Sequence, residues 1–499
     1  MSRARALRAG LERWDATPVV VIAAAVVAFH AVLSGRYGFH RDELYYLAAG
    51  RRPAWGYVDQ PPVVPLLARV IAVVAGEHLW PLRLVAGAVH AGVVVLAALV
   101  ARELGGDRRA TVLAAVATAT APLFVATGSL FQTVPFDQLA WALVWVLVVR
   151  LLRGADARWW LAVGAVFGLG LETKWTITLL GGGLAVGFIA VPDARHHLRS
   201  VWPWAGLAVA LALWLPNLLW QAFNDWPTLE FARNNNADVR AEDGRLGFLA
   251  QQVALVGPLA LPLAAGGLIW MWRRRPWRVL AIAVAAVAVV QFALGAKAYY
   301  LGPVYPLAFA AGGVAAKGWV AGAERRWRWA LGALLLNGII ALPAVAPVAP
   351  VDLYAEVFHD VNDELGEEVG WPDMADQVAA VMHILPADEQ SEARVITASY
   401  GEAAAIDLYG PARDMPRGTA LSAHNSYADW WPDGEPAGTV VTVGYPLHLL
   451  DRYCDALGPA AIVSNPWDVS NDVAGTPILV CRDLRVSPEG LRRALQHYE

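Results

Sequence analysis

Long apolar runs separated by short polar segments fill the chain up to about Pro350. A helix needs about 20 apolar residues to cross a bilayer. The pattern predicts eleven membrane-spanning helices, of which those starting at Trp159 and Lys174 are the shortest. The predicted ranges are 17–34, 82–101, 110–127, 137–152, 159–171, 174–191, 202–220, 249–272, 279–296, 303–320 and 329–348.

The pattern changes at about Pro350. Acidic residues become frequent, and short β-like runs such as "ARVITASY", "GTVVTVG" and "TPILVC" alternate with helical stretches such as "WPDMADQVAAVMHIL". Strands that alternate with helices predict a small α/β domain. We therefore divide the chain into a transmembrane module, 1–349, with a first external loop at 35–81, and a C-terminal α/β domain, 350–499.

The segments between the spans alternate in charge. One set is short and basic, for example "ARELGGDRR", "DARHHLR" and "RRRPWR", and the other is longer or acidic. The positive-inside rule places the basic set in the cytoplasm. We expect a multi-pass protein of the cell membrane with a cytoplasmic N-terminus and an extracytoplasmic C-terminal domain. We also expect "MSRARALRAGLERW" and the run after it to be a retained signal anchor, since no cleavage site follows.

Composition supports a membrane protein and narrows the function. The 499 residues are 57% hydrophobic and 16% charged, whereas soluble domains have about 25% charged residues. The net charge of −4 gives no reason to expect a nucleic-acid surface. Two cysteines, Cys454 and Cys481, are too few for a metal site. They form a disulfide if the C-terminal domain lies outside the cytosol, and the alternative is two free thiols.

The first external loop contains the densest polar sequence, "FHRDELYYLAAGRRPAWGYVDQPP". Within it, "DELYYLAAG" has helical spacing, with Leu44, Leu47 and Ala48 on one side, which fits a helix lying in the membrane interface. A solvated loop would explain the charges alone. The aromatic residues and the double proline that returns the chain to apolar sequence favour a reaction at membrane level.

Six segments carry a resemblance to a known family. They are "DELYYLAAGRRPAWGYVDQPPVVPLL", "FQTVPFDQLAWALVWVLVVRLL", "GLGLETKWT", "WLPNLLWQAFNDWPTLEF", "AKAYYLGPVYP" and "ASYGEAAAIDLYG". In this order they resemble glycosyltransferase family 39, membrane enzymes of the GT-C fold related to protein O-mannosyltransferases and to the lipid A aminoarabinose and galacturonic acid transferases. The resemblance implies an inverting transfer of a sugar from a polyprenyl-phosphate donor to an envelope glycan, lipid or protein on the outer face.

This reaction needs one base for the acceptor hydroxyl and cations for the departing phosphate, because a lipid phosphate leaves without being protonated. The resemblance implies that Asp42 is the base. Glu43 is a second catalytic candidate, although adjacent helix positions point about 100° apart. The alternative for Asp59 is a helix cap, and for Asp137 a position in the wet interface. The residues predicted to bind substrate are Tyr46, Asp59, Gln60 and Asp137.

The donor phosphate needs positive charge near the outer surface. Each lysine or arginine near that surface could instead extend its charge to the lipid headgroups without binding the donor. For Lys174, a further alternative is an ion pair with Glu172. Gln60 stands where relatives carry a lysine or histidine, so the charge must come from elsewhere. We assign no metal site, since His40 and His90 lack ligand spacing, and a divalent cation, which some GT-C relatives use, stays open. The residues predicted to bind the donor phosphate are Lys174, Lys297, Arg83 and Tyr300.

A transporter or a flippase of lipid-linked sugars is the alternative function. Its ionisable residues would gather near the membrane midplane, whereas here they crowd the outer ends of the predicted spans. We therefore predict a glycosyltransferase whose partners are a polyprenyl-phosphate sugar, membrane lipids and an acceptor. The donor sugar and the acceptor stay open.

Overall fold

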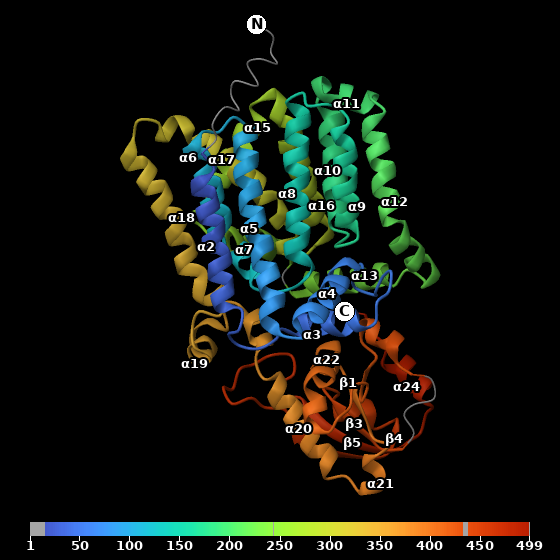
Figure 1. Cartoon of the computed structure of the whole chain (residues 1–499). Helices are drawn as coiled ribbons and strands as arrows, with labels where there is room; N and C mark the ends of the chain where they lie inside the picture. The colour runs from blue at the N-terminus through green and yellow to red at the C-terminus, as the bar shows by residue number, and fades with distance from the viewer. Residues whose placement is uncertain (1–14, 243, 433–437, 499) are drawn as a thin grey trace.

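The computed structural model describes residues 15–242, 244–432 and 438–498. Long helices lie side by side in one bundle, and the C-terminal domain covers one end of it (Figure 1). The bundle helices are α2 (Thr17–Leu33), α5 (Leu79–Glu103), α6 (Arg108–Thr120), α7 (Pro122–Gly128), α8 (Thr133–Leu152), α9 (Trp159–Leu171), α10 (Ile177–Ala190), α12 (Trp202–Phe223), α14 (Gly244–Val256), α15 (Leu261–Trp272), α16 (Arg278–Leu294), α17 (Tyr305–Val320) and α18 (Glu324–Val345).

Burial separates the bundle centre from its lipid-facing rim. Trp141 and Trp145 of α8 are completely buried. Four of the five exposed leucines of α12 recur at every fourth residue, Leu207, Leu211, Leu215 and Leu219, and the fifth is Leu213, as on a helix that turns a broad face to lipid. A Cβ on Gly164 would lie 2.0 Å from the Gly206 carbonyl oxygen, so α9 and α12 touch backbone to backbone.

The predicted spans fall on helices, with two differences. Span 110–127 is bent by 60° between α6 and α7, and span 249–272 is bent by 107° between α14 and α15. The second break lies at Gly257, which has a φ of +82° and precedes Pro258. Among the described residues, five helices are long and apolar enough to cross a membrane, and eight if each bent pair is one span. The total of eleven stays a prediction.

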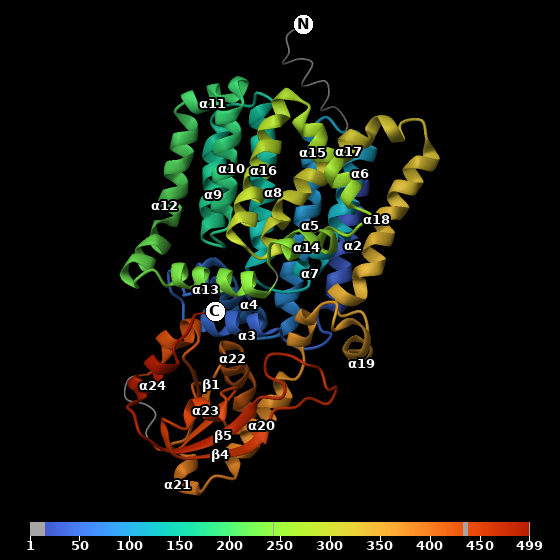
Figure 2. The same ribbon diagram turned by 180° about the vertical axis from the view of Figure 1, so that it is seen from behind.

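Three helices lie between the bundle and the C-terminal domain: α3 (Arg41–Arg51), α4 (Val63–Ala75) and α13 (Pro227–Glu242) (Figure 2). The helix predicted in "DELYYLAAG" is α3. It does not lie open on the surface, because every residue from Glu43 to Gly50 is buried. The C-terminal domain covers α3, and a Cβ on Gly401 would lie 3.0 Å from the Arg41 Cβ.

The C-terminal domain contains a five-stranded mixed sheet in the order β2-β1-β3-β5-β4. Strands β1, β2 and β3 are parallel, and β5 is antiparallel to both β3 and β4. The strands are β1 (Arg394–Thr397), β2 (Ala420–Ser422), β3 (Val440–Val443), β4 (Cys454–Ile462) and β5 (Pro477–Leu484). The helices are α19 (Val351–Leu353), α20 (Trp371–His383), α21 (Ala387–Gln390), α22 (Tyr400–Tyr409), α23 (Leu447–Leu450) and α24 (Pro488–Leu495). The three predicted β-runs are β1, β3 and β5, whereas β2 and β4 were not predicted.

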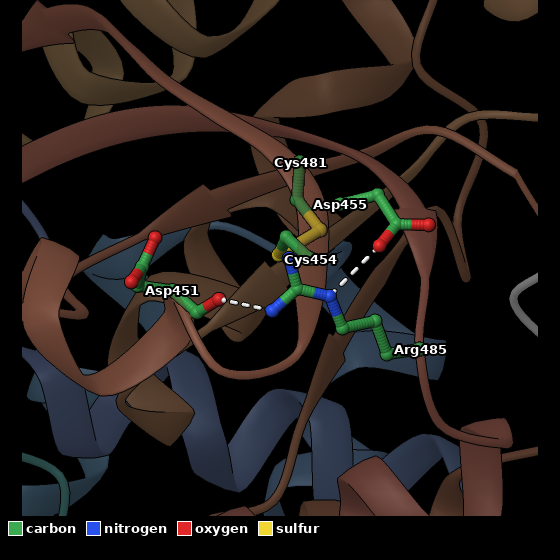
Figure 3. The surroundings of a disulfide bond; sticks show 5 residues. All are labelled: Asp451, Cys454, Asp455, Cys481 and Arg485. Atoms are coloured by element: carbon green, nitrogen blue, oxygen red, sulfur yellow. Dashed lines mark hydrogen bonds and ion pairs between the residues drawn. A yellow bond between two sulfur atoms is a disulfide. The ribbon is translucent and has the colours of Figure 1, made fainter.

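A disulfide joins the edge strand β4 to β5. Cys454 and Cys481 are both buried, and their sulfur atoms are bonded (Figure 3). Beside the bridge, the Arg485 Nε donates to the Asp455 carboxylate at 2.8 Å, and its Nη1 donates to the Asp451 carbonyl at 3.0 Å. The bridge therefore fastens the strand pair at one edge of the sheet.

Candidate active site between the bundle and the C-terminal domain

The first turn of α3 is fixed by a reciprocal cap. The His40 Nδ1 accepts a hydrogen bond from the Asp42 backbone N–H at 3.1 Å, and the Glu43 carboxylate accepts one from the His40 N–H at 3.0 Å. Because Nδ1 is the acceptor, the ring proton lies on Nε2, which is 3.3 Å from the Glu364 carboxylate. This capping box holds Asp42 at a helix N-terminus, where the helix dipole favours an anion.

Glu43 has a structural role. Its Oε1 accepts from the Arg83 Nε and the Phe131 N–H, both at 3.0 Å. Its Oε2 accepts from the Arg83 Nη2 at 2.8 Å as well as from the His40 N–H. Glu43 is completely buried. These four bonds occupy the carboxylate, so the structure argues against the prediction that Glu43 takes part in catalysis.

Arg83 is likewise occupied, which argues against its predicted role in binding the donor phosphate. Besides Glu43, it contacts Glu368 through Nη1 at 3.0 Å and the Gly38 carbonyl through Nη2 at 2.9 Å. It is 1% exposed. Arg83 is a clamp that ties α5, α3 and the segment around Glu368 together.

Asp42 points away from this clamp. Its Oδ1 accepts a hydrogen bond from the Tyr400 hydroxyl at 2.7 Å, and its side chain is partly exposed. Arg41 precedes it and forms ion pairs with Asp472 and, at 3.9 Å, with Glu367. Asp42 is thus an accessible carboxylate that is oriented by a residue of the C-terminal domain.

Asp59 lies close to Asp42 and Lys174. It accepts a hydrogen bond from the Tyr45 hydroxyl at 2.8 Å. The pKa of Asp59 is raised to about 7, chiefly by burial and to a smaller extent by the charge of Asp42, while the Tyr45 hydrogen bond and the Lys174 charge oppose the rise. The charges of Asp42 and Lys174 thus both reach Asp59.

Lys174 lies in the turn between α9 and α10. Its Nζ donates to the Thr133 hydroxyl at 3.2 Å and lies 4.9 Å from the ring centroid of Tyr300 and 5.7 Å from that of Tyr299. Rings at this distance hold a cation by its charge. Among the described residues no ion pair joins Lys174 to Glu172, so the alternative of that pair does not apply.

Lys297 and the two tyrosines complete this side of the site. Lys297 precedes the 3₁₀ helix η3 (Ala298–Val304). The pKa of the Glu364 carboxyl group is lowered to about 2, first by the hydrogen bond from His40. The charges of Arg41 and Lys297 lower this pKa as well, so both cations lie near Glu364. The structure therefore brings together five predicted residues: Asp42, Asp59, Lys174, Lys297 and Tyr300.

Three further predicted residues are buried around them. Asp137 accepts from the Trp141 Nε1 at 3.0 Å and from the Thr176 hydroxyl at 2.9 Å, so it fixes the turn that carries Lys174. Tyr46 packs edge-on against Phe131. Both polar atoms of the Gln60 side chain are buried without a hydrogen-bond partner among the described residues.

Sequence analysis missed several residues of the site. Arg41 was seen only as one charge of the loop, and Thr133 gave no signal. Tyr299 was passed over in favour of Tyr300. Tyr400 lies in a segment that carried the family resemblance, "ASYGEAAAIDLYG", but nothing local links it to Asp42. Within the described ranges, no group of three His, Cys, Asp or Glu side chains could hold a metal ion.

Known proteins resemble the chain in sequence and in fold. The sequence model of the family described as dolichyl-phosphate-mannose-protein mannosyltransferase matches residues 59–220. The lipid A galacturonosyltransferase RgtD of Rhizobium johnstonii is 26% identical over 231 residues, which are 44% of this chain and 47% of that protein. The match thus spans about half the length of this curated relative.

Solved structures share the fold over nearly the whole chain. ArnT from Cupriavidus metallidurans, bound to undecaprenyl phosphate, has a TM-score of 0.58 at 16% identity, covering 97% of this chain and 100% of ArnT. The apo oligosaccharyltransferase of Archaeoglobus fulgidus has a TM-score of 0.51 at 12% identity, covering 87% of this chain and 70% of that one. At these identities the likeness concerns the fold.

The helix bundle under a C-terminal domain is therefore the fold that ArnT and this oligosaccharyltransferase share. The family match over residues 59–220 and the RgtD relative agree with the resemblance to glycosyltransferase family 39 found in the sequence.

Proposed function

We propose that the protein transfers a sugar from a polyprenyl-phosphate donor to a hydroxyl of an envelope acceptor, with inversion, on the outer face of the cell membrane. One observation carries the proposal: the accessible carboxylate of Asp42, which Tyr400 orients, and the ammonium of Lys174, which Thr133 and Tyr300 hold, both influence the pKa of Asp59 and so belong to one site. A base and a cation in the same site fit a displacement at a sugar phosphate. The ArnT structure with undecaprenyl phosphate supports this donor class.

The proposed step is a single displacement. Asp42 accepts the proton of the acceptor hydroxyl while that oxygen bonds to the anomeric carbon. The bond from the anomeric carbon to the phosphate oxygen breaks, and its electron pair leaves with the polyprenyl phosphate. Lys174, supported by Tyr300 and Thr133, binds the negative charge that grows on the phosphate. Lys297 is proposed as a second cation that binds the donor phosphate.

The surrounding residues position these groups. Tyr400 donates to Asp42 and directs its carboxylate. The residues that remain proposed on the substrate side are Asp59, Tyr46, Gln60 and Asp137. Burial is the main cause that raises the pKa of Asp59 to about 7.

The outer-face location rests on charge. The short segments at the far end of the bundle are basic, for example "DARHHLR" and "RRRPWR", which favours the cytoplasm for that end. The domain at the other end carries the disulfide, which favours an oxidising compartment.

The transporter alternative has one structural feature in its favour, since three helix pairs are bent by more than 40° at short breaks. Broken helices do line transport sites near the membrane midplane. Here the cluster of Asp42, Asp59 and Lys174 lies where α3 meets the C-terminal domain, not in the middle of the bundle. The position of this cluster therefore favours a sugar transferase over a transporter.

A transfer assay tests the proposal. The full chain in lipid nanodiscs is given undecaprenyl-phosphate-linked galacturonic acid, arabinose or mannose, with delipidated and intact envelope fractions as acceptors. We expect one donor to be consumed and its sugar to appear on the acceptor with inverted anomeric configuration. Asp42→Asn should lower the rate by about 10²–10⁴-fold, the usual loss for a general base, while undecaprenyl phosphate still binds.

The control is Asp388→Asn, an exposed acid of α21, which should keep the wild-type rate. Asp42→Asn turnover above a tenth of wild type would remove Asp42 as the base. No consumption of any donor, together with no binding of undecaprenyl phosphate, would reject the proposed function.

A further inference from the structure

A cavity lies beside the candidate active site. It has a volume of about 720 Å³ and is bounded by the loop of residues 54–57, the last turn of α12 and the C-terminal domain. Its walls include the aromatic side chains of Tyr57, Trp220 and Trp430 and the polar side chains of Asn224, Asp429 and Arg492. None of these residues belongs to the proposed catalytic machinery.

The aromatic walls are held in place. Trp430 ends the 3₁₀ helix η7 (Asn425–Trp430), packs edge-on against Tyr57 at 6.3 Å, and has the Arg52 guanidinium 4.7 Å from its ring centroid. Opposite, Gly56 lies so close to Trp220 that a Cβ would come within 2.5 Å of the indole. The absence of a side chain at Gly56 lets the loop close onto the end of α12.

The charges in this cavity do not suit a phosphate. The positive charge of Arg492 is opposed by the carboxylate of Asp429 in the same cavity wall. Glu489 also lines the cavity and is paired with Arg493 at 2.5 Å. Carboxylate, guanidinium and amide groups around aromatic faces instead provide hydrogen bonds for hydroxyls and stacking for a sugar ring. The volume falls in the range of about 300–1,000 Å³ typical of small-ligand sites.

The cavity is next to the catalytic carboxylate but separated from it by a wall of two rings. Tyr400, which donates to Asp42, lies 4.6 Å from Tyr45 between ring centroids, and Tyr45 lies 6.0 Å from Trp430. Ser426 ties the wall together, since its N–H donates to the Tyr45 hydroxyl at 3.3 Å and its hydroxyl accepts from the Val58 N–H at 2.9 Å. A glycan that reaches Asp42 past this wall can place another of its sugar units in the cavity.

We propose that this cavity, which we name the Trp220–Trp430 cavity, binds a sugar unit of the acceptor other than the unit that receives the new sugar. The acceptor is then a glycan of at least two sugar units, free or lipid-linked, rather than a protein hydroxyl. This inference rests on the proposed function, because it assigns an acceptor class to the same site.

Direct binding tests the cavity without the reaction. Saturation-transfer NMR of the full chain in nanodiscs is recorded with tetrasaccharides of galacturonic acid, mannose and arabinose, with their methyl glycosides, and with a serine- and threonine-containing peptide. We expect one tetrasaccharide to bind at least tenfold more tightly than its methyl glycoside. Asp429→Asn and Trp220→Ala should each weaken that binding at least tenfold.

Matched controls separate the cavity from the fold. Arg485→Gln and Trp467→Ala change exposed side chains of the same domain outside the cavity. Both variants should bind the tetrasaccharide as wild type does. Asp429 is exposed, so its variant tests the cavity even if Trp220→Ala fails to fold.

The inference would be overturned by a lack of tetrasaccharide binding, or by binding that Asp429→Asn leaves unchanged. Tighter binding of the peptide than of any tetrasaccharide would also overturn it and indicate a protein acceptor. In the transfer assay, a wild-type acceptor KM in Asp429→Asn would reject the cavity while the proposed function stands. A chain that binds the tetrasaccharide but consumes no donor would reject the proposed function instead.

Discussion

Two adjacent acids on one helix turn have opposite environments. Asp42 faces Tyr400 and remains accessible, whereas Glu43 is buried against Arg83. Helix geometry alone predicts that the two side chains diverge. It does not predict which one faces inward, because that depends on an arginine 40 residues away.

At the residue scale, Lys174 is the clearest test of phosphate binding. Lys174→Ala should raise the apparent donor constant about ten- to a hundredfold, because a charge-assisted contact contributes about 1.5–3 kcal/mol. The measurement is a titration of undecaprenyl phosphate against the full chain in nanodiscs.

The matched control for Lys174→Ala is Lys317→Ala. Lys317 is an exposed lysine in the last turn of α17, whereas η3 with Tyr300 precedes the first turn of that helix. This variant should bind the probe as wild type does. If Lys174→Ala also binds normally, the phosphate role passes to Lys297, which is then changed in the same titration.

At the element scale, α3 depends on a buried ion triad. Arg83→Met leaves Glu43 and Glu368 buried without their cation, which should destabilise the protein by about 3–5 kcal/mol. Thermal unfolding of the solubilised full chain, followed by tryptophan fluorescence, should show a clearly lower Tm.

Two further variants separate charge from packing in this triad. Arg69→Met, on the exposed face of α4, should leave Tm unchanged. The triple change Glu43→Met, Arg83→Met and Glu368→Met should recover much of the lost stability, because it removes the uncompensated charges. A single Arg83→Met variant as stable as wild type would show that the triad does not hold α3.

The first turn of α22 predicts a pH dependence of stability. Glu402 closes a capping box with Ser399 and is 2% exposed, and burial raises its pKa to about 8 from the usual 4.5, with Tyr445 close by. Above pH 4.5 the unfolded chain ionises Glu402 while the folded chain keeps it protonated. This group therefore costs no stability below pH 4.5, and its cost grows until the pH passes about 8.

Glu402→Gln keeps the capping box but cannot ionise. Its Tm should fall less than that of wild type between pH 5 and pH 8. Glu392→Gln, an exposed acid before β1, should follow the wild-type curve. Parallel curves for wild type and Glu402→Gln would mean that Glu402 is ionised in the fold.

The helices and strands also show how much of the fold could be predicted from the sequence. The bundle helices, α3 and strands β1, β3 and β5 follow from local periodicity, which is why they were found. The bend at Gly257 could have been expected from the glycine and proline together. Strand β2 is three residues long, and β4 contains Gly458 and Pro459, so both lack a clear alternating pattern.

At the scale of the whole molecule, the site forms where distant segments meet. Tyr400 is 358 residues from Asp42 in sequence, and Glu368 is 285 residues from Arg83. Periodicity and charge patterns are local, so they located the loop, the lysines and the domain separately. They could not predict that the domain covers α3 or that Arg83 is internal.

The disulfide offers a test of how the molecule lies in the membrane. Cysteines of an extracytoplasmic domain oxidise, whereas the cytosol keeps thiols reduced. In intact cells quenched with acid and denatured, Cys454 and Cys481 should react with a polyethylene-glycol maleimide only after reduction. Their loop spans 27 residues, so Cys454→Ala with Cys481→Ala should destabilise the domain by about 3–4 kcal/mol in the chain-entropy account.

In that cysteine-free background, single cysteines place the two ends of the bundle. Ser391→Cys, on the exposed surface between α21 and β1, should react with a membrane-impermeant maleimide in intact cells. Ser200→Cys, in the basic segment before α12, should react only with a permeant one, because the positive-inside rule places that segment in the cytoplasm. The reverse pattern, or free Cys454 and Cys481 before reduction, would put the Asp42 site on the cytoplasmic face. A donor flipped to the outer leaflet could then not reach it, so this outcome would exclude outer-face transfer whatever the activity of the purified chain.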